Sequence, residues 1–144
     1  ASIANDVDVI QIDLEAGLSG FESASFDYVL LSQTIQAVRN SELIMREMMR
    51  VARQGIVTFP NFGHWRHRFD ILRGRMPVSK ALPYQWFATP NICTLHDFEL
   101  LCARLNLRVL NRVVLNESQQ VVNSLPNLLG SLAIYRFESN LAST

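Results

Sequence analysis

The 144-residue sequence lacks an excess of either charge, has few cysteines and contains no long apolar run. Thirteen basic residues balance thirteen acidic ones, so the overall charge gives no reason to expect a nucleic-acid partner. Cys93 and Cys102 form no CxxC pair, which favours free thiols in a reducing compartment. No apolar stretch approaches the ~20 residues of a membrane-spanning helix. We therefore expect a cytoplasmic protein without a membrane partner.

The glycines lack the pattern of a nucleotide-binding turn. A doubly wound sheet that binds a nucleotide usually carries a glycine-rich turn between its first strand and first helix. None of the six glycines belongs to a GxG pair or stands between a predicted strand and a helix. Two interpretations follow: the cofactor loop lies in a preceding segment, or the protein binds no nucleotide.

Strand-like and helix-like segments alternate along the chain. A helix is expected to begin at Asn40 or Ser41, to run to about Arg53 and to be ended by Gln54 and Gly55. The β-branched and apolar runs predict strands at residues 7–12, 26–32, 56–59, 107–115 and 131–138.

A second helix is expected after a capping box formed by Thr94 and Asp97, with Asn106 as its left-handed terminator. The order of elements predicts one α/β domain over residues 1–144, built on a doubly wound, mostly parallel sheet. Because no helix separates the last two strands, we expect the last strand to be antiparallel. The core side of the second helix is predicted to hold Leu95, Phe98, Leu101, Cys102 and Leu105.

Candidate ligand-binding residues follow three predicted strands, because the sites of open α/β sheets lie at the carboxyl ends of the strands. Asp13 either accepts hydrogen bonds from a nucleoside or caps the next turn. Ser32, Gln33 and Thr34 either border a cleft or cap a helix.

Residues 61–86 combine aromatic and basic side chains. One interpretation is a substrate- or partner-binding surface, since arginine grips carboxylates and aromatic rings stack. The alternative is a helix from His64 to Arg73 with a solvated basic face and with Trp65, Phe69 and Leu72 directed inward. The candidate binding residues of this segment are Asn61, His64, Trp65, Arg73, Arg75, Tyr84 and Trp86.

Other chemistries are poorly supported. His64 and His67 have helical spacing, but no further histidine or cysteine lies close by in sequence, so we expect no metal. No serine sits in a GxSxG turn, and neither cysteine has the context of an activated nucleophile. The sequence alone therefore identifies no catalytic residue.

Five stretches stand out: VIQIDLEAGL, SFDYVLLSQTIQAVRN, FPNFGHW, GRMPVSKALPY and CTLHDFELLC. They resemble the MetW family, methyltransferase-like proteins of bacterial methionine biosynthesis. The resemblance implies the class I fold of S-adenosylmethionine-dependent methyltransferases, with sheet order 3-2-1-4-5-7-6. The predicted strands are then the third to seventh, so the domain is expected to be incomplete at its amino terminus. ATPNICTLHDF departs from the family pattern in being two residues shorter.

The resemblance also implies roles for the candidate residues. Asp13 and Leu14 would lie beside the adenine of S-adenosylmethionine, and Ser32, Gln33 and Thr34 beside its amino-acid end. Residues on the acceptor side would be Asn61, His64, Tyr84 and Trp86.

The family's implied partner is homoserine O-acyltransferase, which leaves two hypotheses. The protein is either a methyltransferase acting on a small metabolite or a non-catalytic activator of the acyltransferase. A proton acceptor aimed at a cavity would favour the enzyme, and an exposed apolar patch near residues 62–65 would favour the partner.

Overall fold

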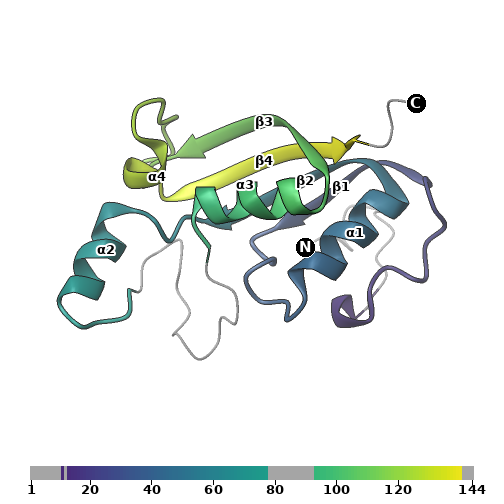
Figure 1. The fold of residues 1–144 in the computed structure, drawn as a ribbon, viewed down its shortest axis with the longest axis horizontal. Coiled ribbons are helices and arrows are strands. Elements are labelled where there is room, and N and C mark those ends of the chain that lie inside the picture. The colour runs from purple at the N-terminus through teal and green to yellow at the C-terminus, as the bar shows by residue number, and fades with distance from the viewer. Residues whose placement is uncertain (1–10, 12, 78–92, 141–144) are drawn as a thin grey trace, which may run out of the picture.

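The computed structural model describes residue 11, residues 13–77 and residues 93–140 (Figure 1). The candidates Tyr84 and Trp86 lie outside the described residues, as does the predicted strand at 7–12 apart from Gln11. The helices are α1 (Ser41–Val51), α2 (Trp65–Leu72), α3 (Leu95–Arg104) and α4 (Pro126–Leu129), and the strands are β1 (Phe26–Ser32), β2 (Ala52–Pro60), β3 (Leu107–Leu115) and β4 (Leu132–Ser139).

The four described strands form one sheet in the order β1-β2-β4-β3. This matches the 4-5-7-6 part of the order that the resemblance implied. β1 and β2 are parallel, whereas β4 is antiparallel to both β2 and β3. The described sheet is therefore mixed rather than mostly parallel. The reason is that β4 lies between two strands that run opposite to it, and the intervening helix α4, with four residues, is too short for a crossover.

Helices α1 and α3 begin with the predicted caps. The Asn40 side chain accepts a hydrogen bond from the Leu43 amide at 3.0 Å. Thr94 and Asp97 form the complete capping box, and Asn106 follows α3 with φ of 56°. These features were predictable because each depends on residues that are neighbours in the sequence.

The predicted end of α1 was wrong. Gly55 does not stop a helix but lies inside β2, opposite Val29 on one side and Phe137 on the other. A Cβ atom at Gly55 would come within 2.6 Å of the Phe137 ring. Residue 55 is therefore glycine because a buried ring packs directly over its backbone.

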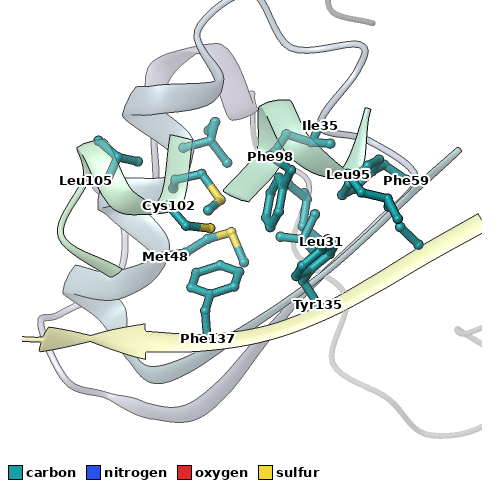
Figure 2. Close-up of a cluster of buried hydrophobic side chains, with 14 of the residues drawn as sticks. Leu31, Ile35, Met48, Phe59, Leu95, Phe98, Cys102, Leu105, Tyr135 and Phe137 are labelled. Atoms are coloured by element: carbon teal, nitrogen blue, oxygen red, sulfur yellow. The ribbon is translucent and has the colours of Figure 1, made fainter. Parts of the chain in front are cut away.

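The main core lies between the sheet and helices α1 and α3 (Figures 1 and 2). At its centre, the ring centroids of Phe59 and Phe98 lie 4.9 Å apart, and those of Phe98 and Tyr135 lie 4.7 Å apart. Cys102 is buried in this cluster, as its position on α3 predicted. Burial raises the pKa of the Cys102 thiol to about 12, so the thiol stays protonated.

On the opposite face of the sheet, apolar side chains are exposed. Phe26, Tyr28 and Leu30 alternate along β1 and are exposed there. Within the described residues, α1 and α3 both pack on the other face. The described part of the chain thus shows only one of the two helical layers expected of a doubly wound sheet.

Candidate functional site

The first predicted ligand-binding residue caps a turn. Asp13 Oδ1 accepts a hydrogen bond from the Glu15 amide at 3.0 Å, at the start of a 3-10 turn, Leu14–Ala16. Glu15 Oε1 then accepts one from the Arg39 amide at 2.8 Å, which ties this turn to the loop between β1 and α1. Asp13 is exposed. The capping interpretation is observed, and the nucleoside-binding role stays a prediction.

The second group lies where β1 and β2 end side by side. The Gln33 amide donates to the carbonyl oxygen and the hydroxyl of Thr58 at 2.9 and 3.0 Å. The Thr34 hydroxyl donates to the Ser32 carbonyl at 2.7 Å, and the Thr58 hydroxyl to Ser32 Oγ at 3.3 Å. Gln33 has φ of 47°, which is unusual for a residue with a side chain and recurs at ligand sites. The predicted polar group at this edge of the sheet is thus compact and held by strand ends.

Sequence reasoning missed Gln36 as a site residue. Its Nε2 donates to the Gln33 carbonyl at 2.7 Å, while its buried Oε1 has no partner within the described residues. The signal available in the sequence was a polar residue shortly after a strand. Gln36 borders a cavity of about 60 Å³ together with Ile35, Ser41, Cys93, Asp97, Phe98 and Leu101.

Asn61 organises the end of β2. It is fully buried, and its Nδ2 donates to the carbonyls of Asn127 and Gly130 at 3.0 and 2.8 Å. Its Oδ1 accepts from the Gly63 amide at 3.0 Å. Asn61 therefore joins the turn before α2 to the segment before β4. In any binding site, its contribution would be to hold neighbouring residues in position.

His64 and His67 form a buried pair at the start of α2. Their ring centroids lie 5.7 Å apart in an edge-on arrangement, and His67 also packs on Phe62. Burial lowers the pKa of both imidazoles, and the proximity of His67 lowers that of His64 further. His67 was not among the predicted site residues, although its Nδ1 is buried without a partner in the described part of the chain. No group of three metal-ligating side chains occurs within the described ranges.

Helix α2 does not direct its apolar residues inward. Trp65, Phe69 and Leu72 are 46%, 46% and 84% exposed. The solvated-helix interpretation was thus correct about the helix but wrong about its apolar side. The reason is that α2 stands beyond the end of the sheet (Figure 1), and no other described helix or strand packs closely along it.

The arginines of this region differ in their surroundings. Arg66 Nη1 pairs with Glu117 at 2.8 Å, and Arg68 Nε donates to the Gly63 carbonyl at 2.7 Å. Arg73 lies 4.1 Å over the centre of the Phe69 ring. Among the described residues, neither Arg73 nor Arg75 pairs with a carboxylate. The predicted residues Trp65, Arg73 and Arg75 therefore belong to one exposed region.

None of the helices in the described ranges is long and apolar enough to span a membrane. Both cysteines are free, and burial raises the pKa of the Cys93 thiol, like that of Cys102, to about 12. A nucleophilic thiolate at either position is disfavoured.

Known structures share this architecture. A SAM-dependent methyltransferase of Thermotoga maritima superposes with a TM-score of 0.58 at 14% identity, covering 83% of this chain and 58% of that one. A protein of Rhodobacter sphaeroides described as a Zn-dependent alcohol dehydrogenase gives 0.57 at 15% identity, covering 96% and 68%. At these identities the likeness concerns the fold alone. The chain therefore has an α/β fold of the kind seen in these two structures.

The amino-acid sequence assigns the chain to a family. It belongs to the family described as methionine biosynthesis protein MetW, whose model matches residues 1–137. A relative from Rhodopirellula baltica, the bifunctional methionine biosynthesis protein MetXA/MetW, is 34% identical over 144 aligned residues. The alignment covers 95% of this chain and 23% of that relative, so the chain spans about a quarter of the relative's length.

Proposed function

We propose that this protein acts in methionine biosynthesis as the methyltransferase-like partner of homoserine O-acyltransferase. The observation that carries the proposal is the bifunctional relative, in which MetXA, which we take to be the acyltransferase, and MetW share one polypeptide. Proteins fused in one organism commonly act together, because fusion keeps the two modules at high effective concentration. The exposed apolar side chains of α2 support this function, since such patches mark interaction surfaces.

The test is reconstitution with the homoserine O-acyltransferase of the same organism. We expect the two full-length proteins to co-purify, and the acyltransferase to be more active in the complex than alone. An unrelated methyltransferase of the same fold serves as the control. Failure of the proteins to associate at micromolar concentration, with no change in acyltransferase activity, would reject the proposal.

A second candidate function is binding of S-adenosylmethionine, with methyl transfer to a small metabolite. The compact polar edge formed by Ser32, Gln33 and Thr34 favours it, because ligands of such sheets bind at the carboxyl ends of parallel strands. Asp13 and Leu14 would contribute the adenine side. Methyl transfer depends chiefly on positioning, so few catalytic groups are required of the protein.

Calorimetry on the full-length protein tests this second function. Asp13→Ala should weaken binding of S-adenosylmethionine by about 1–3 kcal/mol, because a donor of the ligand loses its partner. Asp27→Ala, which removes an exposed carboxylate at the start of β1, is the matched control and should leave binding unchanged. Equal affinity of the Asp13 variant would leave Asp13 only its capping role. The free thiols fit a reducing compartment, so we place either function in the cytoplasm.

A further inference from the structure

We propose that α2 is the docking element for the acyltransferase and that it enters an apolar groove edged by carboxylates. This inference rests on the proposed function. It adds which surface of this protein binds the acyltransferase and what kind of surface on the acyltransferase receives it. We define the docking face as Trp65, Phe69 and Leu72 together with Arg73 and Arg75.

The docking face is apolar where a solvated helix would be polar. Trp65, Phe69 and Leu72 follow one another at intervals of four and three residues, which places them on one side of the helix. All three are at least 46% exposed, and Met76 beyond the helix is 45% exposed. Single exposed apolar residues are ordinary, but several on one short helix form a patch of the kind that partners cover.

The helix is anchored at its base, which makes the face preorganised. His67 is buried against Phe62, and Arg68 Nε holds the Gly63 carbonyl at 2.7 Å. The pairing of Arg66 with Glu117 ties α2 to the loop after β3. A helix held in this way presents its side chains in a defined orientation, so less conformational freedom is lost on binding.

The charges of the face indicate the chemistry of the partner surface. Arg66 and Arg68 are used within the molecule, whereas Arg73 and Arg75 have no carboxylate partner in the described part of the chain. Arginine binds carboxylates through paired hydrogen bonds, so the complementary surface should carry Asp or Glu beside its apolar groove. The stacking of Arg73 on Phe69 holds that guanidinium next to the apolar part of the face.

The occupant we commit to is the acyltransferase, because the bifunctional relative joins MetXA to MetW and the region matched here is only 23% of it. Tryptophan and arginine at the centre and edge of a patch are the residue types that dominate binding energy at protein interfaces. The docking face has both types, in Trp65 and in the two arginines that have no carboxylate partner among the described residues.

The experiment measures affinity between the full-length protein and the acyltransferase. Leu72→Asp places a charge in the apolar part, and the double variant Arg73→Ala, Arg75→Ala removes the cations. We expect each to weaken binding at least tenfold. Wild-type binding should weaken with added salt, and the double variant should show less of this salt dependence.

Matched controls lie away from α2. Leu100→Asp changes an exposed leucine of α3, and the double variant Arg46→Ala, Arg53→Ala removes two exposed cations near α1. Both should bind like wild type. Melting temperatures of all four variants should stay close to that of wild type, because the altered side chains are exposed.

The outcomes separate the two proposals. If wild type binds the acyltransferase and the docking-face variants bind equally well, α2 is not the docking element and only this inference fails. If wild type does not bind, the proposed function fails as well. If Leu72→Asp instead abolishes self-association of this chain without affecting acyltransferase binding, the occupant is a second copy and the inference is overturned.

Discussion

Helices α2 and α3 have comparable lengths and each carries apolar residues at helical spacing, yet they have opposite surroundings. In α3, Leu95, Phe98 and Cys102 are buried between the helix and the sheet, as Figure 2 shows. In α2 the corresponding apolar side chains are exposed, and the buried residue is His67. An apolar stripe therefore predicts that a helix needs a partner, but it does not say whether that partner is the protein's own core.

The largest effect on stability should come from truncating a buried side chain of α3. Phe98→Ala removes a ring that packs on Phe59 and Tyr135, and we expect a loss of about 3–5 kcal/mol in the free energy of unfolding. Phe69→Ala on α2 should cost less than about 1 kcal/mol, since an exposed ring loses mainly its contact with Arg73. Urea denaturation measures both. Similar losses for the two variants would mean that α2 is packed and that the contrast is false.

An intermediate effect is expected at the base of α2. Asn61→Ala leaves the carbonyls of Asn127 and Gly130 and the Gly63 amide without their side-chain partner, which should cost about 1–3 kcal/mol. Asn111→Ala, at an exposed position of β3, is the matched control. The same denaturation experiment applies, and a neutral Asn61 variant would show that the turn before α2 does not depend on this side chain.

Lowering the pH should also destabilise the fold, through the two histidines at the base of α2. Burial lowers the pKa of His64 and His67 below the ordinary value of 6.5, so the unfolded chain binds more protons than the folded one at mildly acidic pH. Stability should therefore be constant above about pH 7 and should fall as the pH drops through and below 6.5. Glu117 and Asp70 oppose this shift in pKa at His67, but burial outweighs them.

Denaturation at pH 7.5 and pH 5 measures the change. The double variant His64→Gln, His67→Gln should show a smaller difference between the two pH values than wild type. An unchanged difference would place the acid sensitivity elsewhere in the protein.

The smallest effect is expected at the surface of α2. Arg66→Ala removes an ion pair with Glu117 whose side chains are both about half exposed, and such pairs contribute roughly 0–1 kcal/mol. A small shift in melting temperature is the expected result. A loss above about 2 kcal/mol would show that this pair, rather than the buried residues, holds α2 in place.

Much of the fold followed from local sequence. The strand runs at β1 and β3, the caps of α1 and α3, and the antiparallel last strand were all predicted and confirmed. The role of Gly55 was predicted wrongly because glycine occurs both at helix ends and at positions where another group packs directly on the backbone. The neighbour is Phe137, 82 residues later in the chain, which no local pattern reveals.

The candidate site was less predictable. The polar group at Ser32, Gln33 and Thr34 was predicted from its place after a strand, and the structure does bring it together with Thr58 of β2. Gln36 was missed and His67 was considered only as a metal ligand, because a buried polar atom without a partner is visible only once its surroundings are known.

By itself, the sequence determined the order of the four described strands and of helices α1 and α3, and the membership of the MetW family, because caps, apolar periods and family motifs lie in short stretches of the chain. Only the tertiary structure decided which apolar side chains became core. Phe98 of α3 is buried against the sheet, whereas Phe69 is exposed on α2, a helix that stands beyond the end of the sheet. Burial depends on segments distant in sequence, so two similar stripes acquired two different roles.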